Sequence, residues 1–266
     1  MKISTNLFLS ILLLVSLCSV SSADPLQNGI EAYQKKDFDA ARQFFLSAAN
    51  GGNPAAQFNL GVMSELGQGG AKSFEAAYQY YLKAAEQGVP QAQYNLGVMT
   101  ALGKGTEQDL AAAVTWYLAA AEDGNANAQY NLGVMYKHGQ GVPQSFKEAE
   151  KWFRRSAAYG NVWAQNNLGF LLEHGQGVPR DAKKAVTWYR KAAEQGFAVA
   201  QLNLGIMYAN GSIASDKFDH AYAWWTVAAT QGNKTAQTLI ELAPTKFSAD
   251  HIQSGQRLAE RLLRAN

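Results

Sequence analysis

The 266-residue chain contains a single cysteine, Cys18. This residue lies in an apolar N-terminal segment, so removal of that segment would leave a protein without any cysteine. The rest of the chain therefore has no disulfide framework, cysteine nucleophile or thiolate metal site. If the protein is secreted, it must be held together by side-chain packing alone.

Charge and catalytic motifs are also scarce. Charged residues make up 17% of the chain, the formal net charge is +2, and no run of like charges occurs. Neither nucleic acid nor an anionic membrane surface is expected as a partner. Gly-x-Ser-x-Gly, Ser-x-x-Lys and His-Glu-x-x-His patterns are missing from the sequence. We expect no catalytic residue, no cofactor and, because His138 and His174 are explained by repetition alone, no metal site.

Residues 1–23 have the pattern of a secretory signal peptide. Lys2 precedes an apolar run from Leu7 to Val15, and Ser21-Ser22-Ala23 supplies small residues for cleavage. The run is shorter than the ~20 residues that a spanning helix needs, and Leu17 before Cys18 does not fit a lipoprotein site. We expect cleavage after Ala23, no later membrane insertion, and export to the periplasm, with secretion as the alternative.

The most abundant signal is repetition. The phrase Ala-Gln-x-Asn-Leu-Gly, or a close variant of it, returns five times at a constant step of 36 residues, beginning at Ala56, Ala92, Ala128, Ala164 and Ala200. A fixed period of this length is typical of a solenoid, in which each unit buries its apolar face against its neighbours. Such arrays form binding surfaces more often than enclosed active sites.

Each 36-residue unit contains two helical patterns. Ala128, Leu132 and Met135 share one helix face, and glycines then end that helix. Ser145 is a candidate cap for the second helix. A glycine in the middle of each first helix costs roughly 1 kcal/mol, which indicates that a neighbouring helix touches the backbone there. Bulky residues share one register in the second helices, and we expect them to interlock with small residues of facing helices: Tyr80, Trp116, Trp152, Trp188 and Trp224.

These motifs resemble the Sel1-like repeat, a longer relative of the tetratricopeptide repeat. The segment from Ala164 to Gly196 matches that pattern at Ala164, Leu168, Gly169, Gly175, Gly177, Val178, Pro179, Asp181, Ala185, Trp188, Tyr189, Ala192, Ala193 and Gly196. The resemblance implies an all-α fold, an α/α solenoid wound as a right-handed superhelix of helix-turn-helix repeats. It covers five repeats in residues 53–232.

Both ends depart from the repeat. Residues 24–52 form a shorter hairpin without the glycine-rich loop, closer to a tetratricopeptide unit. Residues 233–266 begin the motif again, but Ile240-Glu241 replaces Leu-Gly, Pro244 shortens the helix, and Ser248 starts a final amphipathic helix. We expect both ends to be caps, because terminal units of an array must turn one face to water.

A second stripe on each first helix is a candidate partner-binding surface. In tetratricopeptide-like arrays the first helices line the concave side, so the resemblance implies a groove there for a peptide or helix. The alternative is that the stripe packs against the next repeat and leaves no groove. The stripe consists of Phe58, Val62, Tyr94, Val98, Tyr130, Val134, Asn166, Phe170, Leu202 and Ile206.

A row of asparagines borders this stripe, and Trp163 is a lone large aromatic at a position that varies between repeats. An asparagine amide both donates and accepts, so the row suits an extended peptide backbone, but it also suits ties between neighbouring helices. Trp163 is a candidate interface anchor, or a packed surface side chain. The row consists of Asn59, Asn95, Asn131, Asn167 and Asn203.

The predicted function is a non-catalytic scaffold for protein–protein interaction in a bacterial cell envelope or outside the cell. One alternative is an enzyme that binds or hydrolyses cell-wall fragments or β-lactams, although the Sel1-like proteins linked to such activity are rich in cysteine. Another is an accessory factor dedicated to one envelope or host-interaction protein. The oligomeric state does not follow from the sequence.

Overall fold

The computed structural model describes residues 24–212 and 217–265, so the predicted signal peptide lies outside the described residues. Within them the regular structure is entirely helical, without a strand. The chain divides into two compact units, with the boundary after Gln144 in the loop that follows α7. Each unit is described by itself.

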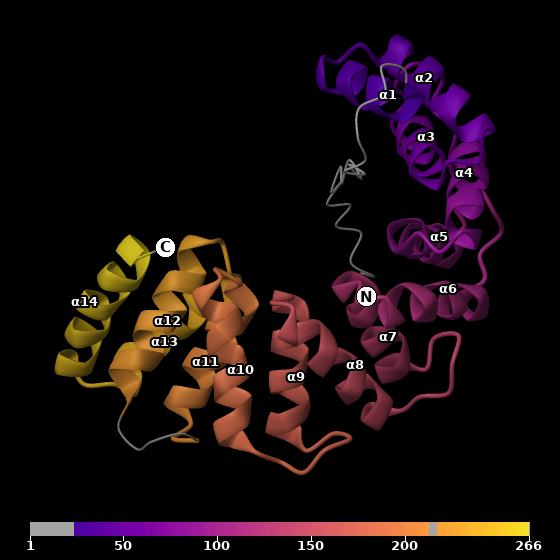
Figure 1. Cartoon of the computed structure of the whole chain (residues 1–266). Coiled ribbons are helices and arrows are strands. Elements are labelled where there is room, and N and C mark those ends of the chain that lie inside the picture. The colour runs from indigo at the N-terminus through magenta and orange to yellow at the C-terminus, as the bar shows by residue number, and fades with distance from the viewer. Residues whose placement is uncertain (1–23, 213–216, 266) are drawn as a thin grey trace. The chain divides into compact units, whose positions relative to one another are not determined.

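The N-terminal unit is a series of helices in which sequence neighbours pack antiparallel (Figure 1). The first hairpin is short, because only residues 35–37 separate its two helices. The later pairs are joined by glycine-containing loops. The helices are α1 (Pro25–Gln34), α2 (Phe38–Asn50), α3 (Pro54–Leu66), α4 (Phe74–Glu86), α5 (Pro90–Leu102), α6 (Leu110–Glu122) and α7 (Ala126–His138).

The C-terminal unit continues the same alternation and ends in a longer helix that packs on α12. As expected from Pro244, α13 is short and is followed by a single 3-10 turn, Ala243–Thr245. The helices are α8 (Phe146–Ala158), α9 (Val162–His174), α10 (Ala182–Glu194), α11 (Ala198–Ala209), α12 (Phe218–Thr230), α13 (Lys234–Leu242) and α14 (Ala249–Ala265).

Local sequence signals set most helix boundaries. Ser145 caps α8, as predicted, because its hydroxyl accepts from the Glu148 amide at 3.2 Å. Gly139 ends α7 at a φ of 67°, the left-handed conformation that favours glycine. In the final helix, the amide of His251 donates to the Ser248 hydroxyl at 3.3 Å. The helix starts and stops predicted at these positions are confirmed.

The mid-helix glycines lie against aromatic rings, which confirms that another helix approaches their backbone. A Cβ at Gly97 would lie 2.6 Å from the ring of Tyr117, and one at Gly61 would lie 2.5 Å from the ring of Tyr81. The sequence did not indicate which ring meets each glycine. Tyr117, the residue after Trp116, faces Gly97, and one residue corresponds to about 100° of rotation about the helix axis.

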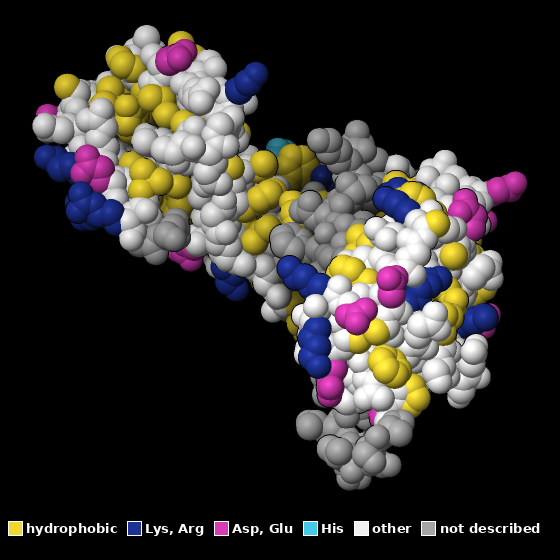
Figure 2. All heavy atoms as spheres, turned by 90° about the horizontal axis from the view of Figure 1, so that it is seen from above, with side chains coloured by type: hydrophobic (Ala, Val, Ile, Leu, Met, Phe, Trp, Pro, Cys, Tyr) yellow, Lys and Arg dark blue, Asp and Glu magenta, His cyan; other side chains and the backbone are white. Residues whose placement is uncertain are grey.

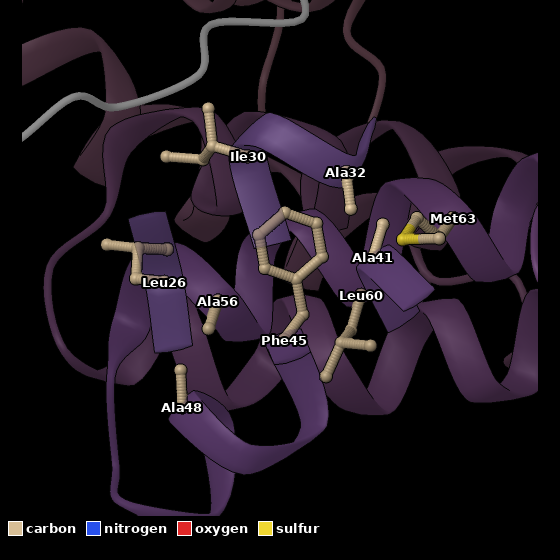
Figure 3. Close-up of a cluster of buried hydrophobic side chains, with 9 residues drawn as sticks. All are labelled: Leu26, Ile30, Ala32, Ala41, Phe45, Ala48, Ala56, Leu60 and Met63. Carbon is tan, nitrogen blue, oxygen red and sulfur yellow. The ribbon is translucent and has the colours of Figure 1, made fainter. Parts of the chain in front are cut away.

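The first hairpin and α3 share a core that shows the same principle (Figure 3). The ring of Phe45 lies at its centre, and a Cβ at Gly29 would be 2.6 Å from that ring. Leu60 and Met63 of α3 complete the cluster, and both side chains are fully buried. The short hairpin is therefore packed onto the first full repeat.

Glutamines tie successive helices together through a repeated pair of hydrogen bonds. Gln201 Nε2 donates to the carbonyl of Ala193 at 3.1 Å, while its Oε1 accepts from Gln231 at 2.9 Å. In the N-terminal unit, Gln57 Oε1 likewise accepts from Gln87 at 2.7 Å. The glutamines of the repeated phrase therefore hold successive helices together. The sequence alone did not indicate this role.

Two links of this pattern are incomplete, at Gln93 and at Gln129, and the first of them leads to a prediction. Gln93 donates to Ala85, but its buried Oε1 has no partner among the described residues, since Asp123 stands where other repeats have a donating glutamine. We expect Asp123→Gln to raise the free energy of unfolding by about 1 kcal/mol, because it supplies the missing donor. Chemical denaturation measures this change.

Asp123→Asn is the matched control. It removes the same negative charge from the C-terminal end of α6, where an acidic group is unfavourable, but its shorter side chain does not reach as far. Equal stabilisation by both variants would assign the gain to charge and contradict the hydrogen-bond explanation.

Candidate functional site

The candidate site is the first-helix face, which each unit carries separately: the predicted stripe lies on α3, α5 and α7 in the N-terminal unit and on α9 and α11 in the C-terminal unit. These helices carry few charges: their only Lys, Arg, Asp or Glu residues are Glu65, Lys137 and Glu173. Two of these charges point toward the second helices, because Glu65 and Glu173 accept hydrogen bonds from tyrosines there. The face is therefore almost uncharged.

In the N-terminal unit the first-helix face is largely covered by the protein itself. Phe58 is 4% exposed, and its ring centroid lies 5.7 Å from that of Tyr81. It also shares a hydrophobic core with residues of α5. At this position the stripe packs against the next repeat, as the alternative interpretation expected. Val98 and Tyr130 are also buried, whereas Val62, Tyr94 and Val134 remain half-buried.

In the C-terminal unit more of the face remains accessible. Phe170, Leu202, Ile206 and Asn166 are all half-buried. Val199, one turn before Leu202 on α11, is 43% exposed, so it extends the apolar surface beyond the predicted residues. Its position beside the stripe at helical spacing was the signal that could have identified it.

Trp163 lies next to this surface, at the start of α9. It is half-buried, and its ring makes an edge contact with Phe197, with 6.2 Å between the ring centroids. Its carbonyl accepts a hydrogen bond from the Asn167 amide at 2.9 Å. The side chain is thus anchored by packing while part of it stays accessible.

Several of the asparagine side chains make contacts within the protein itself. Asn203 donates to Asn166 at 3.0 Å, which joins two successive repeats of the C-terminal unit. In the N-terminal unit Asn59 and Asn131 are buried, whereas Asn95 is half-buried. Burial raises the pKa of the Tyr81 hydroxyl, and a hydrogen bond with the Asn95 side chain lowers it in part. These contacts link helices of neighbouring repeats.

Two of the tyrosines that pack on the glycines have strongly raised pKa values. Burial raises the pKa of Tyr81 well above its usual value, and the negative charge of Glu65 raises it further. Tyr189 has the same two causes, with Glu173 as the charged neighbour. These hydroxyls therefore remain protonated and act as hydrogen-bond donors at neutral pH.

The two repeated histidines, one in each unit, have different surroundings. His174 is exposed, its Nδ1 is 3.0 Å from the Phe170 carbonyl, and its ring stacks on Phe170. Burial lowers the pKa of His138, and the nearby Lys137 lowers it further. Among residues 24–212 and 217–265, no three His, Cys, Asp or Glu side chains are placed to hold a metal ion.

Two surface properties bear on the kind of partner. Charged side chains are dispersed among uncharged ones over the face presented in Figure 2. In the described part of the chain, no helix combines the length and the apolar character needed to cross a bilayer.

The comparison with protein families identifies the repeat. The family model described as the Sel1 repeat matches residues 26–53, 54–89, 90–125, 126–161, 164–197 and 198–233. The first match falls on the α1–α2 hairpin, which lacks the glycine-rich loop. Sel1 repeats generally mediate protein–protein binding and are typically non-catalytic scaffolds.

The comparison with solved structures leads to the same family. A Sel1 repeat protein from Oxalobacter formigenes is 34% identical, with a TM-score of 0.76 and coverage of 91% of this chain and 96% of that one. The antigen c5321 of uropathogenic Escherichia coli, described as protective and as having an SLR fold, is 32% identical with a TM-score of 0.81. That alignment covers 90% of this chain but about half, 53%, of c5321. A search of curated proteins returned no match.

Proposed function

Because the chain belongs to the Sel1 repeat family, we propose that it is a non-catalytic scaffold that holds a protein partner on its first-helix face. The observation that carries this proposal is the nearly uncharged, half-buried surface of α9 and α11. Phe170, Leu202 and Ile206 lie on it, with the more exposed Val199 beside them. Such a surface suits the apolar side of a peptide or helix.

We propose that the protein works in the cell envelope or outside the cell. The N-terminal signal pattern and the absence of cysteine after residue 23 support an exported protein stabilised by packing. The similarity to c5321, a protective antigen, is compatible with exposure to the outside. Cleavage after Ala23 would release a protein that begins at Asp24.

Partner capture tests the proposal. We expect the double substitution Leu202→Asp and Ile206→Asp to lower the partner's affinity at least tenfold, about 1.4 kcal/mol, because it places two carboxylates one turn apart on an apolar surface. The tagged full chain is expressed in its own cells, cross-linked, and isolated from the envelope and the medium. Quantitative mass spectrometry measures captured partners and determines whether the protein begins at Asp24.

The matched control is Lys183→Asp with Thr187→Asp, which has the same spacing on the exposed surface of α10. Thermal melts followed by circular dichroism establish that both variants are folded. Equal partner recovery by wild type and the α11 variant would exclude the first-helix face as the binding surface. Retention of residues 1–23 on a cytoplasmic protein would contradict export.

A further inference from the structure

Two repeats place a carboxylate against the tyrosine that packs on the mid-helix glycine. Tyr81 donates to Oε2 of Glu65 at 3.0 Å, and Tyr189 donates to Oε2 of Glu173 at 2.8 Å. In both pairs the glutamate lies one turn after the glycine on the first helix. The tyrosine–carboxylate contact is thus a repeated element of this protein.

The repeat formed by α5 and α6 has the tyrosine without the carboxylate. Tyr117 lies on Gly97 as its counterparts lie on theirs, but Ala101 stands where the glutamate would be. The side chain of Tyr117 is 1% exposed, and its hydroxyl has no hydrogen-bond partner among the described residues. A buried hydroxyl without a partner destabilises the folded state, so an acceptor from elsewhere would be favoured.

Asn131 of α7 contributes a second donor at the same place. It is 3% exposed, and its Nδ2 likewise makes no hydrogen bond of acceptable geometry within residues 24–212 and 217–265. Burial raises the pKa of Tyr94 to about 12 and raises that of Tyr117 beyond the usual range, while the Asn131 amide lowers both. The ring centroids of Tyr94 and Tyr117 are 6.0 Å apart, so the two phenols are neighbours, and the Asn131 amide interacts with both. All three groups can donate at neutral pH.

We propose that a carboxylate of the bound partner occupies the place beside Tyr117 and Asn131 that Glu65 and Glu173 fill in two other repeats. The two oxygens of a carboxylate can accept from the phenol and the amide together. Tyr94, a half-buried residue of the first-helix face, is the third donor and the accessible side of this subsite. Because Ala101 and Tyr117 are covered, the Tyr94 ring must turn outward for the carboxylate to enter.

The inference rests on the proposed function, because the carboxylate belongs to the partner that binds the first-helix face. It adds that the partner is acidic at one point, through an Asp or Glu side chain or through its chain terminus. The uncharged character of the surrounding face makes a single buried carboxylate a strong determinant of specificity.

Acetate is the probe for this subsite. The full chain is labelled at the tyrosine Cζ atoms and titrated with sodium acetate at constant ionic strength, balanced with sodium chloride. We expect a saturable chemical-shift change at Tyr117 and none at Tyr189, whose hydroxyl already donates to Glu173. A Tyr117 resonance that does not respond, or that responds only linearly as Tyr189 does, would overturn the proposal.

Two variants sharpen the test. Ala101→Glu should abolish the acetate response, since it introduces the acceptor found in the other two repeats, and an unchanged response would refute the site. Tyr117→Phe should leave the melting temperature unchanged or raise it, whereas Tyr189→Phe should lower it. A fall in both would mean that the Tyr117 hydroxyl already has a partner, which contradicts the inference.

The source of the carboxylate is distinguished with two further probes. Tighter binding of N-acetylglycine than of N-acetylaspartate amide indicates a chain terminus, and the reverse order indicates an acidic side chain. A negative titration in a protein that still captures its partner through α11 would overturn the carboxylate subsite alone. Loss of the α11 effect would instead contradict the proposed function.

Discussion

Replacing Gly105 by alanine is expected to lower the free energy of unfolding by about 3 kcal/mol. Gly105 has a φ of 68°, where a Cβ is strained by about 1 kcal/mol, and the added Cβ would also overlap the backbone carbonyl of Phe74 at the start of α4. Backbone cannot move aside as a side chain can, so the overlap adds about 2 kcal/mol. We expect the melting temperature to fall by about 6–12 °C.

Gly88→Ala is the matched control for this prediction. Gly88 has a similar φ of 80°, but a Cβ there would meet nothing within 4 Å. Its substitution should therefore cost only the conformational strain, about 1 kcal/mol. If both variants lose the same stability in chemical denaturation, the packing of the Gly105 loop on Phe74 of the preceding repeat does not contribute, and our explanation of the larger effect at Gly105 is wrong.

Replacing Gly255 by leucine is expected to detach α14 from α12. A Cβ at this position would lie 2.8 Å from the carbonyl oxygen of Asp219 and 2.8 Å from Cβ of Tyr222. Detachment would expose the small core in which Ala223 and Val227 of α12 pack against α14. We expect the C-terminal unit to lose about 2–3 kcal/mol, because a leucine cannot be accommodated without separation of the helices.

Hydrogen exchange with mass spectrometry checks this result. The amides of α14 should exchange rapidly in Gly255→Leu, while those of the N-terminal unit keep their protection. Gln256→Leu adds the same side chain at the neighbouring, exposed position and should leave exchange unchanged. Retained protection of α14 in the Gly255 variant would show that this helix does not depend on the close approach, which would remove the basis for its predicted role as a cap.

The candidate site was only partly accessible to sequence reasoning. The stripe was recognisable because helical spacing puts Leu202 and Ile206 on one face. The pattern could not reveal that Phe58, at the equivalent place in another repeat, is covered by packing. It also gave no sign of the donors around Tyr117, since their convergence depends on Asn131 in the next repeat and on what Ala101 lacks.

By itself the sequence determined the helical array, its 36-residue period and most helix boundaries, because these follow from spacing along one chain and from caps that act within a few residues. The tertiary structure alone decided which side chain meets which across helices. A rotation of one residue about a helix axis moves a side chain by about 100°, so Tyr117 rather than Trp116 lies on Gly97. Packing against the neighbouring repeat likewise decides that Phe58 is covered, whereas Leu202 at the equivalent place stays half-buried.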